Sequence, residues 1–458
     1  MGGPADRRVH SSRSMGCAAQ PGSRIVVTMS CPHQPDAPSR APGLHRPPRT
    51  GRERTDRRRS PEPHRLAAPG RLVGVDVTRG LALLGMMAVH SLWAYDENGD
   101  VTWHYALAAG RSAATFALLA GIGIAFMTGR RQVEAGEWKP TAASLAARAG
   151  VIAAVGLFLG WTDASLATVI LVYYAVLFLL AIPMVLLSTR VLLAVGTAIA
   201  VVVPVLSHLV RPALPAASGD NVTLGQLVTD PLGSLLELTV TGLYPALPWM
   251  AYLCIGIAIG RLRLSERRVA VRLLATGAAV AVGAWAVSTV LLGPLGGESR
   301  LYATAAASGS SETAVSNLLV FGGDGITPTD TWWWLATAAP HTSTPLDLLH
   351  TIGAGTALLG ALLLVAPRAG RWLSPIAAAG GMTLTLYTAH VLFINSPLDV
   401  FAATPGYLLQ VVAALAFAVA WRRTVGRGPL ERLAADAARR ARRAVDGRDG
   451  GPVAATRR

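Results

Sequence analysis

Repeated apolar runs of about 20 residues restrict the fold of this chain more than any other feature of its sequence. Of its 458 residues, 52% are hydrophobic and 15% are charged, whereas a soluble chain usually contains about 25% charged residues. A run of this length crosses a bilayer as a helix, because lipid offers no hydrogen-bond partner to a free backbone group. The sequence therefore predicts an all-α, polytopic membrane protein with about ten transmembrane helices.

The expected spans follow one another after Gly70. We place them at roughly 75–95, 106–128, 142–162, 167–187, 191–210, 238–259, 269–293, 347–367, 374–395 and 402–421. Residues 1–70 are rich in Arg, Pro, Gly and Ser and are expected to form a disordered basic tail. The bundle is expected to cover 71–425. A basic tail, 426–458, follows it and is expected to be partly helical on the membrane surface.

The loops between the spans alternate in charge. Basic residues mark the N-terminal tail, the loops that contain Arg130, Arg190, Arg261 and Arg368, and the C-terminal tail. Acidic residues mark the opposite loops, beginning with Asp96, Glu97 and Asp100. Because positively charged loops stay in the cytoplasm, the pattern predicts that both termini are cytoplasmic.

The net charge of +15 raises the question of nucleic-acid binding. The basic residues gather in the tails and in short loops, where they suit the anionic inner leaflet of a plasma membrane. We therefore expect a multi-pass plasma-membrane protein whose basic residues meet membrane lipid and not nucleic acid. The three cysteines include no CxxC pair, so neither a disulfide framework nor a metal site is expected.

The ionisable side chains within the spans gather at a few places. One such group in hydrocarbon costs roughly 2.5 kcal/mol or more, so it is usually retained for function. With the expected orientation, one set lies in the outer third of the bundle: His90, His104, Arg111, Asp347, His350 and His390. We interpret this set as the lining of one functional cavity that faces away from the cytosol.

Spacing adds detail to this interpretation. Asp347 and His350 are three residues apart on one helix face, where a carboxylate can orient an imidazole. Thr383, Tyr387 and His390 form a polar stripe on another helix. Three of these residues also have a non-catalytic interpretation. In that interpretation His104 is a solvated loop residue, His390 is a structural hydrogen-bond partner, and Arg111 binds lipid phosphate.

Two further groups have two interpretations each. Asp76 and Arg79 at the cytoplasmic edge form either an anchoring ion pair or, with Arg130 and Arg131, a site for a phosphorylated cofactor. Trp332, Trp333 and Trp334 in the long loop form either an interfacial belt or a platform that stacks on a sugar.

Several blocks of the sequence carry a family resemblance. VDVTRGLALLGMMAVH, followed by an aromatic and His-containing loop and by AGRSAATFALLAGIGIA, resembles the opening of the heparan-α-glucosaminide N-acetyltransferase-like, YeiB-type family of membrane acyltransferases. YYAVLFLLAIP, LPWMAYLCIGIAIGRL, PHTSTPLDLLHTIG and GGMTLTLYTAHVLF resemble the remaining blocks of its bacterial branch. The resemblance covers 71 to about 430.

The resemblance implies transfer of an acetyl group from cytosolic acetyl-CoA, as co-substrate, to an amine or hydroxyl of an extracytoplasmic glycan or similar acceptor. The key histidine of the family lies in the loop before the second span, which His104 matches best. The family commonly has Asn at the position of His90, which implies a polar lining group there.

We therefore hypothesise that His104, or failing it His90 or His350, is the acetyl carrier or the general base. Asp347 would orient an imidazole and Arg111 would stabilise the oxyanion. Two other classes remain open: a proton-coupled transporter or exporter with a histidine-lined outer cavity, and a non-catalytic membrane scaffold.

Overall fold

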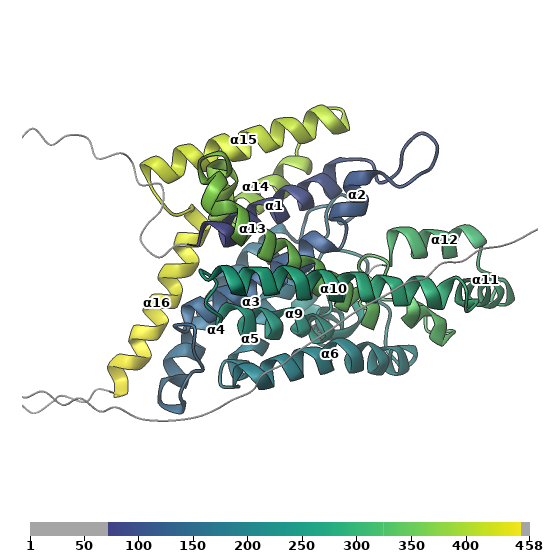
Figure 1. The fold of residues 1–458 in the computed structure, drawn as a ribbon, viewed down its shortest axis with the longest axis horizontal. Coiled ribbons are helices and arrows are strands. Elements are labelled where there is room, and N and C mark those ends of the chain that lie inside the picture. The colour runs from purple at the N-terminus through teal and green to yellow at the C-terminus, as the bar shows by residue number, and fades with distance from the viewer. Residues whose placement is uncertain (1–71, 324, 450–458) are drawn as a thin grey trace, which may run out of the picture. The chain divides into compact units, whose positions relative to one another are not determined.

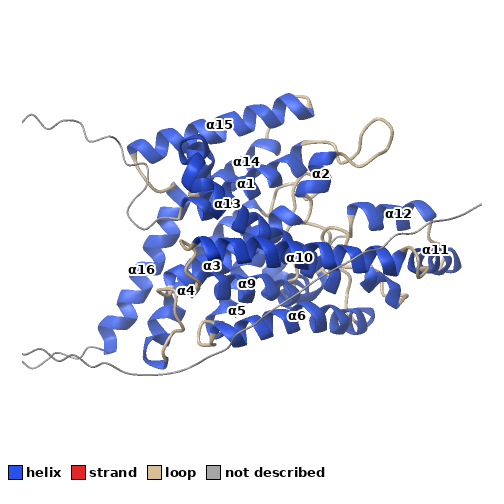
Figure 2. Cartoon of the chain, in the orientation of Figure 1, coloured by secondary structure: helices blue, strands red, loops and turns tan. Residues whose placement is uncertain are grey.

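The computed structural model describes residues 72–323 and 325–449, and the regular elements in these two ranges are helices (Figures 1 and 2). The loop after the first helix adds one isolated bridge, between Tyr95 and Val101. The expected all-α class is confirmed. The expected N-terminal tail, 1–70, lies outside the described residues.

The helices follow one another along the chain with short connections. The longer ones are α1 (Val73–Ser91), α3 (Arg111–Met127), α4 (Trp138–Leu159), α5 (Leu171–Met184), α6 (Thr189–Val210), α9 (Ala246–Gly260), α10 (Arg267–Leu292), α13 (Pro345–Gly380), α14 (Thr383–Ile394), α15 (Ala403–Thr424) and α16 (Pro429–Asp449). The shorter ones are α2 (Trp103–Ala108), η1 (Ala135–Glu137), η2 (Arg211–Ala213), α7 (Leu224–Thr229), α8 (Pro231–Leu236), η3 (Glu237–Thr241), α11 (Gly297–Ala307), α12 (Glu312–Phe321) and η4 (Trp332–Ala336).

The expected count of ten spans is not confirmed. Within the described residues, seven helices are long and apolar enough to cross a membrane, or eight if the pair Pro231–Thr241 and Ala246–Gly260, bent by 53°, is one span. The expected fourth and ninth spans correspond to α5 and α14, which have 14 and 12 residues. At about 1.5 Å per residue, both are shorter than a hydrocarbon core of roughly 30 Å. The ninth is short because α13 continues past Pro367 and Pro375 to Gly380.

Glycines allow the principal helices to pack closely. On α10 and α13, a Cβ added to Gly277 would lie 2.5 Å from the backbone N of Ala357, and one added to Gly353 would lie 2.5 Å from that of Ala281. On α1 and α13, a Cβ on Gly380 would fall on the carbonyl oxygen of Asp76. Small residues at such crossings are typical of membrane helices, which associate through close packing and not through the hydrophobic effect.

The bundle has an α2 end and an α16 end. The α2 end contains α2, the last turn of α1 and the first turns of α3 and α13. The α16 end contains the first turn of α1, the last turns of α3 and α13, and the start of α14. In Figure 1, α16 crosses the α16 end at a steep angle to the neighbouring helices. It packs against α4 and α14, and its Glu431 carboxylate accepts hydrogen bonds from the backbone N–H groups of Leu384 (2.7 Å) and Thr385 (3.1 Å).

The three consecutive tryptophans lie in η4 and have different surroundings. Trp334 is buried and donates its indole N–H to Asp330 (2.8 Å). Trp333 lies under the guanidinium of Arg300, 5.1 Å from its ring centroid. Trp332 keeps 55% of its surface exposed. The three rings therefore have different partners, and the interfacial belt and the sugar platform both stay predictions.

We predict that Gly380→Ala destabilises the fold by about 1–3 kcal/mol, because the new methyl group must displace α1 at Asp76. Gly370→Ala on the same helix is the matched control, because a Cβ there meets no atom within 4 Å. Thermal unfolding of both variants in detergent tests the difference. Equal melting temperatures for the two variants would show that the crossing of α1 and α13 is looser than described.

Candidate active site

A cavity of about 340 Å³ lies between α1, α3, α4, α5, α14 and α16. Charged side chains line it at the α16 end, and aromatic and aliphatic side chains line it farther inside. Its polar and aromatic lining comprises Arg79, Arg148, Glu431, Thr383, Phe116, Phe126, Phe178, Tyr174 and Tyr387.

Two guanidinium groups give the cavity a basic character. Arg79 lies 3.9 Å from Asp76 and donates a hydrogen bond to the carbonyl oxygen of Leu119 (3.3 Å). Arg148 lies over the ring of Phe178, and its Nε is buried with no hydrogen-bond partner among the described residues. Planar guanidinium groups bind phosphate with parallel hydrogen bonds. The sequence analysis missed Arg148, although one charge inside the apolar run of α4 was a signal that could have revealed it.

Two tyrosines mark the inner end of the cavity. Tyr174 donates its hydroxyl proton to the carbonyl oxygen of Ala113 (3.1 Å), and the hydroxyl oxygen of Tyr387 accepts from the backbone N–H of Ile170 (3.4 Å). Met86 lines the same region. His90 follows Met86 by four residues and His390 follows Tyr387 by three, so both imidazoles lie about one helical turn beyond the cavity.

These two imidazoles form a hydrogen-bonded pair. His90 Nδ1 lies 3.0 Å from His390 Nε2, and the rings are nearly parallel, at 7°. His390 Nδ1 lies 2.6 Å from Gln410 Oε1, and Gln410 donates from Nε2 to the Ser91 hydroxyl (3.3 Å). Residues from α1, α14 and α15 thus form one continuous polar chain at the α2 end.

Arg111 and His350 form a second pair. Arg111 donates from Nε to His350 Nε2 (3.1 Å), and His350 Nδ1 lies 2.9 Å from the carbonyl oxygen of Ala281. A carbonyl only accepts, so the proton of the neutral ring is on Nδ1. Both ring nitrogens are therefore engaged, and His350 keeps no free lone pair for base or carrier chemistry.

Asp347 contacts a backbone loop and not His350. Its carboxylate accepts from the backbone N–H of Ser343 (3.0 Å), and its own N–H donates to the Thr344 hydroxyl (3.1 Å), which caps α13. His341 and Ser343 in this loop have φ values of 56° and 50°, which are strained for residues with a side chain. The expected orientation of His350 by Asp347 is replaced by stabilisation of this loop.

His341 itself is a residue that the sequence analysis missed. Its Nε2 accepts from the backbone N–H of Gly110 (3.2 Å), so the proton of the neutral ring is on Nδ1. Nδ1 is buried and has no hydrogen-bond partner among the described residues. An unpaired buried donor costs about 1–3 kcal/mol. The strained backbone that places it cannot be read from local sequence.

His104 lies apart from both pairs, in a surface groove between the loop after α1 and the start of α15. Its Nε2 is 3.0 Å from the carbonyl oxygen of Trp93 and 3.0 Å from the Thr102 hydroxyl. No hydrogen bond between described side chains joins His104 or the Arg111–His350 pair to the His90–His390 pair. One pocket shared by all the expected residues stays a prediction.

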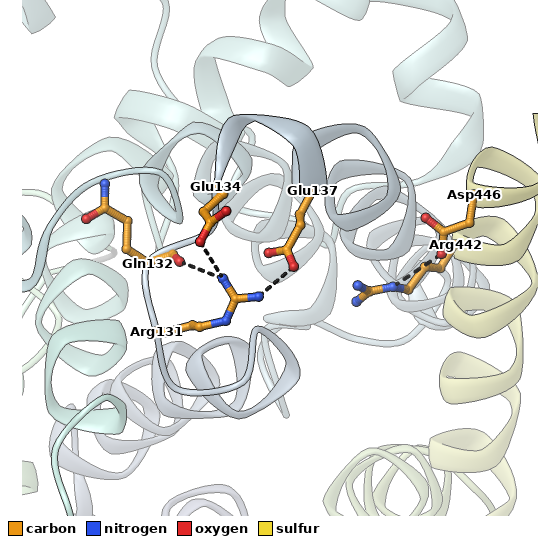
Figure 3. A network of polar contacts seen from close by, with 6 residues as sticks. All are labelled: Arg131, Gln132, Glu134, Glu137, Arg442 and Asp446. Carbon is orange, nitrogen blue, oxygen red and sulfur yellow. Dashed lines mark hydrogen bonds and ion pairs between the residues drawn. The ribbon is translucent and has the colours of Figure 1, made fainter. Parts of the chain in front are cut away.

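The two other arginines of the expected cofactor site differ in their surroundings. Arg131 is paired with Glu137 (2.5 Å) and Glu134 (3.8 Å) and does not line the cavity (Figure 3). Arg130 lies over the ring of Phe126, 4.4 Å from its centroid, and Phe126 lines the cavity. Arg79 is therefore the expected cofactor-site arginine that reaches the cavity directly.

The family model described as the catalytic domain of heparan-alpha-glucosaminide N-acetyltransferase matches residues 71–292. This part of the chain, a little under half of its length, is similar to that family. The resemblance drawn from the sequence is confirmed over that range, and the apolar helices agree with a membrane acetyltransferase. No curated protein matches the chain.

The matched range contains part of the candidate site. Arg79, Arg148, Tyr174 and His90 lie within it, as do His104 and Arg111. The helices after it supply Tyr387, His390, Gln410 and Glu431. The cavity and the imidazole pair therefore combine the family domain with the chain that follows it.

We predict a pH effect on stability from His341, in the loop before α13. Burial lowers the pKa of His341 from 6.5 to about 4. The unfolded chain therefore binds a proton at higher pH than the folded one, and this residue favours folding above about pH 6.5. Its contribution, up to roughly 3 kcal/mol, is lost as the pH falls toward 4.

Thermal unfolding in detergent at about pH 7 and about pH 4.5 measures this effect. The melting temperature of the unmodified protein should fall more steeply with acid than that of His341→Gln. Parallel pH profiles for the two proteins would contradict the assigned burial of the ring.

Proposed function

We propose that this protein transfers an acetyl group from cytosolic acetyl-CoA to an amine or hydroxyl of an extracytoplasmic glycan or similar small acceptor. One observation carries the proposal. An arginine-lined cavity at the α16 end extends to within one helical turn of a hydrogen-bonded imidazole pair at the α2 end. In the orientation expected from loop charge, the α16 end faces the cytosol of a plasma membrane.

The residues of the cavity fit the donor. CoA carries phosphates, which suit Arg79 and Arg148, and a long uncharged arm, which suits the apolar and aromatic walls. The carboxylate of Glu431 is already engaged by the N-terminus of α14, so it opposes these phosphates less than a free acid would. The rise along α1 from Arg79 to His90 is about 16 Å, a distance that an extended arm must cover.

The imidazole pair then supplies the base. His90 Nε2 accepts a proton from the acceptor amine or hydroxyl as its nitrogen or oxygen bonds to the acetyl carbon. The C–S bond breaks, and the CoA thiolate leaves and takes up that proton, so the products are the acetylated acceptor and CoA. Arg111, held by His350, stabilises the developing oxyanion. His104 is the alternative base that the family resemblance implies.

The same imidazole pair keeps a transporter as the second candidate, because two histidines in hydrogen-bond contact can relay a proton across a bundle. A transporter would move its substrate in vesicles without acetyl-CoA and would depend on a proton gradient. An acetyltransferase would need acetyl-CoA and no gradient.

Binding of the acetyl donor tests the assignment of the cavity. Acetyl-CoA should stabilise the purified protein against heat, and ATP should not. Arg148→Ala should weaken acetyl-CoA binding roughly 10–100-fold, because it removes a charged hydrogen bond to phosphate. Arg263→Ala is the matched control, since Arg263 is exposed and pairs with Glu266 away from the cavity. Equal binding by both variants would remove the cavity as the donor site.

Transfer of labelled acetyl groups into vesicles tests the assignment of the base. His90→Ala should lower turnover about 100-fold or more and should leave the heat stabilisation by acetyl-CoA intact, because only proton transfer is lost. His104→Ala should lower it less, since that ring lies in a separate groove. The opposite ranking would assign the base to His104 and leave the overall function standing.

A further inference from the structure

We propose that Gln410, on α15, is a positioning residue for His90 and acts through His390. This inference rests on the proposed acetyl transfer. It concerns a helix that lies outside the matched family domain, and it names what fixes the proton positions of the imidazole pair.

The first support is the burial of Gln410 on a helix that is largely exposed. Gln410 is 8% exposed, whereas the neighbouring Leu409 is 45% exposed and Val412 is 64% exposed. A polar side chain buried among apolar helices is costly unless its hydrogen bonds are made. Both ends of this amide make them, with His390 and with Ser91.

The second support is the direction of these hydrogen bonds. The amide oxygen of Gln410 only accepts, so the bond of 2.6 Å places a proton on His390 Nδ1. His390 Nε2 then carries a lone pair and accepts from His90 Nδ1–H across 3.0 Å. His90 Nε2 is left with the free lone pair that a general base requires.

The third support is the anchoring of the amide itself. The NH2 group of Gln410 donates to Ser91, the residue next to His90. One turn earlier on α15, Tyr407 donates its hydroxyl proton to the carbonyl oxygen of Leu84 on α1 (3.3 Å). These two contacts hold α15 against α1, so the amide oxygen stays directed at His390 and one tautomer of the pair is favoured.

The test compares two variants of Gln410 in the labelled transfer assay. Gln410→Leu removes the acceptor oxygen, and kcat should fall roughly 10–100-fold while the KM for acetyl-CoA stays unchanged. Gln410→Glu keeps an acceptor oxygen at this place and should restore kcat to near the unmodified value. Leu409→Ala, at the exposed neighbouring position, is the matched control.

Two further measurements distinguish a fall in kcat through lost positioning from one through misfolding of the variant. Each variant should retain the heat stabilisation by acetyl-CoA, and adding Gln410→Leu to His390→Ala should cause no further loss, because the two residues act as one unit. Unchanged kcat in Gln410→Leu, or equal loss in the Leu and Glu variants, overturns the inference. Failure of the unmodified protein to transfer acetyl overturns the proposed function instead.

Discussion

The close crossing of α1 and α13 is the contact on which the candidate site depends. It is possible because Gly380 lies against the backbone of Asp76 with no side chain between them. α14 begins three residues later, at Thr383, so its polar stripe is carried directly to the α1 surface. Tyr387 then lines the inner end of the cavity, and His390 lies within hydrogen-bond distance of His90. A wider crossing would separate the two imidazoles, and a base would lose the partner that orients it.

The sequence predicted the features that depend on local pattern. Apolar length gave the helical class and most helix positions, and the cost of a buried charge pointed to Arg79, His90 and His390. The pairing of His90 with His390 joins residues 300 positions apart, and helical periodicity contains no information on which distant helix faces which. The count of ten spans is not confirmed, because α13 continues through two prolines and leaves α14 short; a membrane helix can satisfy the backbone groups that proline leaves free.

Asp347 and His341 have contacts that their spacing in the sequence does not predict. A spacing of three places Asp347 and His350 on one helix face, but Asp347 is in the first turn of α13, where free backbone N–H groups compete for a carboxylate. The backbone N–H of Ser343, in the preceding loop, donates to the Asp347 carboxylate, and the His350 imidazole accepts from Arg111 instead. The same loop has a left-handed backbone at His341. Such strain depends on the surrounding packing, so PHTSTP alone gives no sign of it.

The C-terminal helix α16 forms part of the candidate site. Glu431 lines the cavity and also accepts a hydrogen bond from the first turn of α14. The start of α16 is therefore one side of the cavity. α16 also packs along α4, the helix that carries Arg148. Removing or displacing α16 would take Glu431 away both from the cavity wall and from the first turn of α14.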